Sequence, residues 1–148
     1  MLLAFRRRIR HPFYPALKPA SAVDAQATPS SLTGTFAELS RAAAAGVRVE
    51  RAVFPQYSPA NPFPSEGERD ALWSMFEVPV MAMLVDQGGV IGYECEMQEG
   101  FHLKEESAGG RLSGRLEHSL CECGRPGPRL MPAGEATPEL VSLASAAD

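Results

Sequence analysis

Four potential metal ligands lie between positions 95 and 123, and they constrain the fold more than any other feature. Cys95 and His102 form one pair, and Cys121 and Cys123 form the other. The second pair has the form of a metal-binding knuckle, in which Gly124 lets the chain bend without a Cβ clash. Two such pairs from separate loops usually assemble a closed tetrahedral site, and three thiolates with one imidazole favour zinc. The sequence therefore predicts a structural zinc site formed by Cys95, His102, Cys121 and Cys123.

Other interpretations of these residues stay open at this stage. His118 is an alternative ligand to His102, because its spacing from Cys121 is also workable. Unligated cysteines are commonly buried as small hydrophobic side chains, which is an alternative for Cys95. A redox pair is a further alternative for Cys121 and Cys123. We favour zinc with His102, and we expect two nearby cations to offset the thiolate charge. These are Arg125 and Arg129.

The composition limits how much of the chain can pack. The 148 residues include 13 glycines and 13 prolines, so much of the length forms turns and loops, and a metal would add useful stability. A formal net charge of −4 argues against a nucleic-acid-binding surface over the whole molecule. An odd count of 3 cysteines and a start without a secretory leader predict a cytoplasmic protein. No apolar run approaches the ~20 residues of a membrane helix.

Changes in composition along the chain predict three parts. Residues 1–33 are typical of a basic arm followed by a flexible linker of Pro, Ala, Ser and Thr. Residues 34–130 are expected to form the zinc-stapled domain. Residues 131–148 are rich in Ala, Pro and Ser and predict a disordered tail.

Two helices are predicted ahead of the metal ligands. In residues 35–45 the apolar side chains share one face, and Gly46 suits the end of a helix. Ser65 and Glu68 have the spacing of a capping box, so a second helix is expected to start there and to end near position 77. This helix is expected to bury Leu72, Trp73 and Phe76.

The strands are predicted from alternating apolar residues and from turn residues. Residues 47–53 favour a short strand, residues 80–97 favour a hairpin with its turn at 86–89, and residues 102–105 favour a third strand. Residues 54–64 are rich in proline, which lacks a backbone donor, so we expect an extended loop outside any central sheet. The predicted fold class is α+β, with a small antiparallel sheet around the hairpin, two helices, a zinc knuckle and flexible termini.

Two segments around the metal ligands resemble a known family. They are YECEMQEGFH at positions 93–102 and CECGRPGPRL at positions 121–130. Together they resemble the phenylacetate–coenzyme A ligases, adenylate-forming enzymes that include the F390-synthetase-like proteins. The resemblance covers about residues 69–130. It implies that the zinc ligands are the cysteines and the histidine of these two motifs, which here are Cys95, His102, Cys121 and Cys123.

The departures from this family concern its catalytic parts. Where the family carries a YGxTE-type motif that contacts the adenylate and magnesium, this chain has residues 83–87, in which only Asp86 could supply a carboxylate. The family's phosphate loop is absent, and neither Lys18 nor Lys104 has the context of its catalytic lysine. The interval from the histidine to the second cysteine motif is also shorter than the family would use. The sequence therefore predicts a non-catalytic zinc-binding domain that binds or regulates a protein partner.

Two other functions stay open. The chain is alternatively a component of an adenylate-forming enzyme that completes its site with a partner chain and uses Asp86 to hold a carboxylate or nucleotide. ATP binding in the presence of the partner would distinguish this function. A redox sensor that uses Cys121 and Cys123 would instead show reversible two-electron oxidation without metal. No nucleic-acid partner and no membrane span are expected, and the sequence does not identify a small-molecule ligand.

Overall fold

The computed structural model describes residues 11–87, 89–104 and 114–132, and these form an α+β fold with an eight-stranded mixed sheet. The strand order in the sheet is β1-β2-β3-β4-β5-β6-β8-β7. The strands are β1 (Ala20–Ser21), β2 (Ser31–Gly34), β3 (Ala52–Tyr57), β4 (Met83–Asp86), β5 (Gly89–Tyr93), β6 (Phe101–Leu103), β7 (Arg115–Glu117) and β8 (Arg129–Met131). The helices are α1 (Phe36–Ala44) and α2 (Glu66–Phe76). The predicted α+β class is confirmed, but the sheet is larger than the small sheet that we expected.

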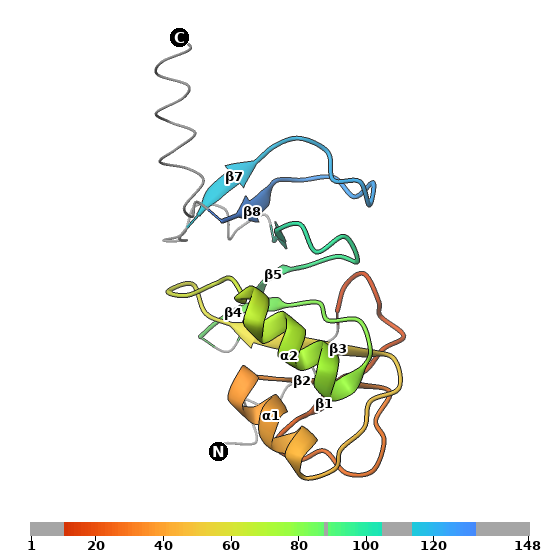
Figure 1. The fold of residues 1–148 in the computed structure, drawn as a ribbon. Helices are drawn as coiled ribbons and strands as arrows, with labels where there is room; N and C mark the ends of the chain where they lie inside the picture. The colour runs from red at the N-terminus through yellow and green to blue at the C-terminus, as the bar shows by residue number, and fades with distance from the viewer. Residues whose placement is uncertain (1–10, 88, 105–113, 133–148) are drawn as a thin grey trace.

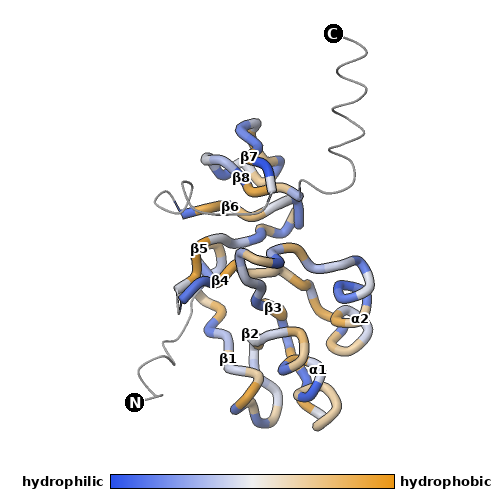
Figure 2. Tube along the Cα trace, turned by 90° about the vertical axis from the view of Figure 1, so that its left-hand side faces the viewer, coloured by the Kyte–Doolittle hydropathy of each residue, from blue (hydrophilic) through white to orange (hydrophobic). Residues whose placement is uncertain are grey.

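The sheet has a parallel part and an antiparallel part. Strands β1 to β4 pair in parallel, and every later pair, from β4–β5 onward, is antiparallel. Helix α1 connects β2 to β3 and α2 connects β3 to β4, which is how parallel strands are usually joined. Both helices lie on one side of the parallel strands, and the strands follow one another from β1 at the bottom to β7 at the top (Figure 1 and Figure 2).

Both helices begin with a capping box. The Oγ1 of Thr35 accepts the amide of Glu38 at 3.2 Å, and the Glu38 carboxylate accepts the amide of Thr35 at 2.9 Å. Ser65 and Glu68 repeat this arrangement at 3.1 and 3.2 Å. Two amides at each helix start are thereby satisfied by the helix's own residues. The second helix ends at Glu77, which adopts the left-handed conformation, and both predicted helices are confirmed.

Apolar side chains alternate between the two faces of the sheet. On the helix side, Leu39, Leu72 and Phe76 pack with Val53 and Val80. The opposite face is covered by residues 11–17, which we call the N-terminal segment. Its packing partners are Ala52, Phe54, Met81, Met83, Val90 and Tyr93. A third cluster, on the antiparallel strands, consists of Ala82, Leu84, Phe101 and Leu130. The sheet is therefore packed on both faces where its strands are parallel.

Two predictions about the helical part are wrong. Trp73 is 54% exposed, because Leu72 and Phe76 define the buried face of α2 and Trp73 lies about 100° further round the helix. The strand predicted over residues 47–53 begins only at Ala52. The amide of Val47 instead donates to the carbonyl of Ala42 at 3.0 Å, so this residue still belongs to the end of α1.

The prediction that residues 54–64 lie outside the sheet is also wrong for residues 54–57, which belong to β3. Strand β3 includes Pro55 and pairs with β2 on one side and β4 on the other. On the side of β4, Val53 pairs with Val80 and Gln56 pairs with Met83, so Pro55 lies between two paired positions. The amide of Ala82, which the register places opposite Pro55, donates to the Glu94 carboxylate at 2.7 Å. The missing donor of proline thus interrupts the pairing without removing the strand.

The described part of the predicted arm and linker is packed. Strand β1 and the first three residues of β2 lie within residues 11–33, all four residues of β2 are buried, and His11 is 0% exposed. The linker prediction differs from the structure because β2 is a short parallel strand, which carries no alternating pattern. Residues 1–10 of the predicted basic arm and residues 133–148 of the predicted tail lie outside the described residues.

The predicted hairpin is present with shorter strands. β4 and β5 pair around the turn after Asp86, with β4 beginning at Met83 and β5 ending at Tyr93. The third strand is present as β6, although position 105 lies outside the described residues. Strands β7 and β8 were not expected, since each has only three residues next to glycine and proline. These added strands extend the sheet over the region that carries the cysteines.

Candidate metal site

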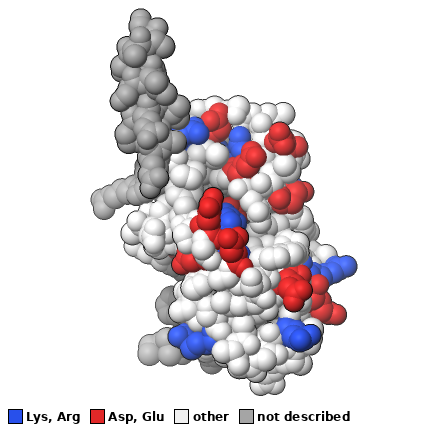
Figure 3. Space-filling model, in the orientation of Figure 1, with Lys and Arg blue, Asp and Glu red and all other residues white. Residues whose placement is uncertain are grey.

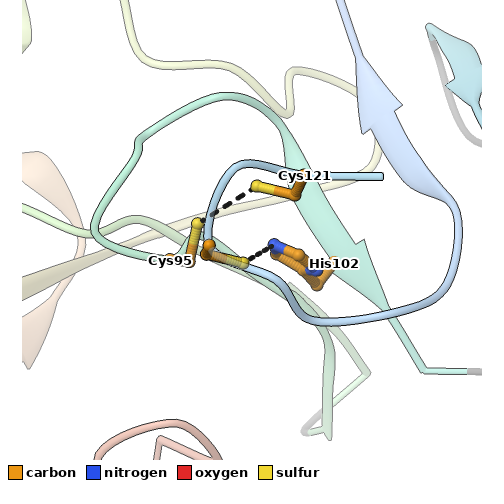
Figure 4. A group of neighbouring side chains, drawn as sticks. Cys95, His102 and Cys121 are labelled. Carbon is orange, nitrogen blue, oxygen red and sulfur yellow. Dashed lines mark hydrogen bonds between the residues drawn. The ribbon is translucent and has the colours of Figure 1, made fainter. Parts of the chain in front are cut away.

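The four predicted ligands come together from three segments of the antiparallel part. Cys95 follows β5, His102 lies in β6, and Cys121 and Cys123 lie between β7 and β8. Their ligand atoms all lie within 4.8 Å of one another, and the side chains of Cys95, His102 and Cys121 point toward the same small region (Figure 4). Three of the four residues are buried, and Cys123 is half-buried. Residues separated in the sequence thus form one compact Cys₃His cluster.

The distances within the cluster fit a tetrahedral ion. The Sγ atoms of Cys95 and Cys121 are 3.7 Å apart, and the Sγ of Cys123 lies 3.6 Å from the Nε2 of His102. Tetrahedral zinc, with bonds of ~2.3 Å to sulfur and ~2.0 Å to nitrogen, separates two sulfurs by about 3.8 Å and a sulfur and a nitrogen by about 3.5 Å. All three thiols are free, with no disulfide among them. These two distances therefore match a four-ligand tetrahedral site, and no two of the four ligand atoms are more than 4.8 Å apart.

Cys95 begins a tight turn whose backbone faces its sulfur. The amide of Gln98 donates to the carbonyl of Cys95 at 3.0 Å, and Gln98 adopts a positive φ of 55°. The amide of Met97 points at the Sγ of Cys95 at 3.4 Å. A hydrogen bond from a backbone amide stabilises a thiolate more than a neutral thiol. This turn therefore holds Cys95 in a form suited to metal binding.

The second cysteine pair is held by a similar turn. The amide of Gly124 donates to the carbonyl of Cys121 at 2.9 Å, with a φ of 85° that glycine adopts without strain. The amide of Arg125 then points at the Sγ of Cys123 at 3.4 Å. Both turns thus combine one turn hydrogen bond with one amide directed at a sulfur. The tight turn at Cys121–Gly124 is the one that the knuckle motif predicted.

Burial and hydrogen bonding act in opposite directions on the thiols. Burial raises the pKa of the Cys95 thiol to about 12. Burial also opposes ionisation of Cys123, but the amide of Arg125 and hydrogen bonds from Cys121 and Cys95 outweigh it, so the pKa of Cys123 is lowered. Of these two thiols, Cys123 is therefore the more readily ionised. A divalent cation would offset the cost of ionising the buried thiols.

The predicted arginines both lie next to the cluster. Besides its amide contact with Cys123, Arg125 forms an ion pair with Glu96 at 2.7 Å. Arg129 is buried and donates through Nη1 to the carbonyl of Glu99 at 2.8 Å. It also contributes to lowering the pKa of His102, after burial, which is the larger cause. These two cations lie where they would offset the charge of three thiolates.

His102, not His118, belongs to the cluster. His118 is exposed and lies outside the group of ligand atoms. The Nε2 of His102 faces Cys123, while its Nδ1 is buried without a hydrogen-bond partner among the described residues. The ring of Phe13 packs edge-on against His102 at 5.1 Å between centroids. The structure therefore offers Nε2 as the ligand atom of this histidine.

Glu94 anchors the end of the strand that precedes Cys95, and no pattern in the sequence indicated this role. Its buried carboxylate forms a two-point ion pair with Arg69 of α2 and accepts the amide of Ala82. Its backbone carbonyl lies 3.0 Å from the Nε2 of His11. Burial raises the pKa of Glu94, and Arg69 opposes this effect. Glu94 thus connects α2, the residue that precedes β4 and the N-terminal segment at the position next to Cys95.

Comparison with known proteins gives no family for this chain, since no protein-family model and no curated protein matches it. In the described part of the chain, neither helix has the length and apolar character needed to cross a membrane. The site must therefore be interpreted from its own geometry. That geometry defines a buried Cys₃His cluster with the dimensions of a metal site.

Proposed function

We propose that this chain is a non-catalytic zinc-binding domain, in which zinc joins the loops of the antiparallel strands and the domain binds or regulates a protein partner. The observation that supports it most is the convergence of Cys95, His102, Cys121 and Cys123 within 4.8 Å. Four protein ligands fill a tetrahedral shell and leave no position for water or substrate, which is the pattern of structural zinc. Unoxidised thiols in such a site suit a reducing compartment, and we propose the cytoplasm.

The ligand set supports a relationship to part of a phenylacetate–coenzyme A ligase. These four residues are the ones that the resemblance implies. They are close in space although β6 and β7 lie between Cys95 and Cys121 in the chain. The catalytic features of that family have no counterpart in the described residues. At both helix starts a carboxylate, that of Glu38 or Glu68, accepts the N-cap amide and would repel a phosphate group bound there. These observations favour a domain that has the zinc site without the adenylation chemistry.

The distribution of charge favours a protein over a nucleic acid as the partner. On the face of the molecule shown in Figure 3, acidic and basic side chains of the described residues are intermixed, and no continuous basic surface is seen there. Nucleic-acid surfaces need clustered cations along a groove or face. A mixed surface of this kind suits a protein contact.

A second candidate function is a component of an adenylate-forming enzyme. One observation favours it: β2, β3 and β4 are parallel, and Asp86 lies exposed at the carboxyl end of β4. In open α/β sheets, ligands bind at this edge. The two functions differ in nucleotide binding, because the component would bind ATP when its partner chain is present and the binding domain would not.

Elemental mass spectrometry of protein purified without added metal tests the proposal. We expect one zinc per chain, its loss in Cys121→Ser, and its retention in His118→Ala, which removes the histidine outside the cluster. A folded wild-type protein without zinc would refute the proposed site. Zinc that survives in Cys121→Ser and disappears in His118→Ala would refute the ligand set.

A further inference from the structure

A cleft lies between the N-terminal segment and the face of the sheet opposite the helices. Its volume is about 690 Å³, within the ~300–1,000 Å³ of small-molecule sites. Phe13, Tyr14 and Leu17 line one side, and Ala52 and Met81 line the other. It lies where β3 begins and just before β4, at the amino ends of these parallel strands. The cleft is therefore separate from the strand edge that carries Asp86.

The walls of the cleft are mainly apolar, and the charges at its rim are unequal. Glu96 lines it, but its carboxylate is paired with Arg125 at 2.7 Å and accepts the hydroxyl of Tyr14 at 2.8 Å. Arg51 also lines it, is exposed, and has no acidic partner among the described residues. The charge left without a partner is therefore positive. An apolar molecule with one negative group would match both the walls and the rim.

We propose that this cleft binds a small apolar organic anion. The apolar body of the ligand packs between Phe13 and Met81, and its anionic group pairs with Arg51. The guanidinium group of arginine is well suited to carboxylates, sulfonates and phosphates, because its donors form a planar fork. An aromatic wall and a methionine accept flat or flexible apolar groups. The chemistry of the site thus defines the ligand as amphiphilic and singly negative.

The wall formed by the N-terminal segment depends on residues next to the metal cluster. The guanidinium of Arg125 lies 4.0 Å from the centroid of the Phe13 ring, and the same ring packs against His102. Tyr14 is held by Glu96, which Arg125 also holds. Loss of the metal would release Arg125 and His102 and would loosen this wall. The metal dependence of ligand binding rests on the proposed zinc site, whereas the cleft itself does not.

Two fluorescent probes test the ligand class in the full chain. 8-Anilinonaphthalene-1-sulfonate and N-phenyl-1-naphthylamine share an aromatic body, and only the first carries a negative charge. We expect one site for the sulfonate and a weaker site for the neutral probe. Arg51→Ala should weaken sulfonate binding about five-fold, the effect of one exposed ion pair, and leave the neutral probe unchanged. Arg48→Ala removes an exposed arginine outside the cleft and should change neither probe.

A second variant tests the location of the site. Ala16 is exposed on the rim, so Ala16→Trp should fill the cleft without disturbing the core and weaken both probes at least about ten-fold. Ala60→Trp adds the same ring at an exposed position elsewhere and should have no effect. Unchanged binding in Ala16→Trp would overturn the proposed location. Equal binding of the sulfonate by wild type and Arg51→Ala would overturn the ligand class.

Zinc content measured in the same samples separates this inference from the proposed function. If zinc is present, its removal by a chelator should weaken both probes, and unchanged binding would overturn the coupling between site and cleft. If wild-type protein contains no zinc, the zinc site and the coupling both fail. The results with Arg51 and Ala16 then decide the ligand site by themselves.

Discussion

The parallel and antiparallel parts of the sheet are stabilised in different ways. In the parallel part, α1 and α2 pack on one face and the N-terminal segment packs on the other, so apolar side chains are buried on both sides. In the antiparallel part, β6, β7 and β8 have three residues each, and the apolar cluster centres on Leu84, Phe101 and Leu130. The Cys₃His cluster lies in this second part. A small region with few apolar contacts can gain from a metal the stability that its core does not supply.

This comparison also explains the position of the residues that join the two parts. Glu94 directly follows the antiparallel hairpin, and its carboxylate is paired with Arg69 of the helical part. His11 stacks on Phe54 of β3 at 5.0 Å and bonds to the backbone of Glu94. The ligand Cys95 follows directly. The packed part of the fold thereby holds Cys95, whereas His102, Cys121 and Cys123 are carried by the short strand β6 and by the segment between β7 and β8.

Removal of zinc should give the largest effect and should affect the two parts unequally. A structural zinc contributes on the order of 10 kcal/mol in isolated zinc fingers. We expect chelation to abolish hydrogen-exchange protection in β6–β8, including the amide of Leu103, and to leave β2 and β3 largely protected. Exchange detected by mass spectrometry on peptides from each part measures this difference. Equal loss of protection in both parts would contradict it and would show one cooperative unit.

A core substitution in the helical part should give the converse result. Leu72 is 0% exposed, and Leu72→Ala is expected to lower the free energy of unfolding by about 3–4 kcal/mol through lost burial and a cavity. Zinc content should stay unchanged, because α2 contributes no ligand. Urea denaturation measures the loss, and Leu120→Ala, at a position that is 70% exposed, is the control. A loss of zinc in Leu72→Ala would show that the helical part controls the metal site.

The acid dependence of stability should report the junction between the parts. Burial lowers the pKa of His11 from 6.5 to about 4. Between pH 6.5 and about 4, the unfolded chain therefore binds a proton at His11 and the folded chain does not. The contribution of His11 to the free energy of unfolding is thus fully present above pH 6.5 and is lost as the pH drops toward 4. The decrease should reach about 3 kcal/mol. Urea titrations with zinc content monitored at each pH measure it, and His11→Gln should lack this component of the slope.

Local chemical signals in the sequence predicted what they directly specify. Ser65 and Glu68 identified the start of α2, the turn residues after Asp86 identified the hairpin, and the CxC pair identified one half of the cluster. The sequence did not identify β2, because a fully buried parallel strand lacks alternation. Nor did it identify the contact of His11 with Glu94, which joins residues 83 positions apart. Contacts of this kind depend on the assembled sheet and leave no periodic pattern in the chain.

The smallest effect should come from a helix cap in the parallel part. Thr35→Ala removes the side chain that accepts the amide of Glu38, and it should cost about 1 kcal/mol. The loss should be measurable by urea denaturation and should leave zinc content and protection in β6–β8 unchanged. Thr28→Ala, at an exposed threonine outside any helix, is the control. If Thr35→Ala also reduced protection around Cys121, the two parts would not be independent, and a single cooperative fold would replace the division into a packed part and a metal-dependent part.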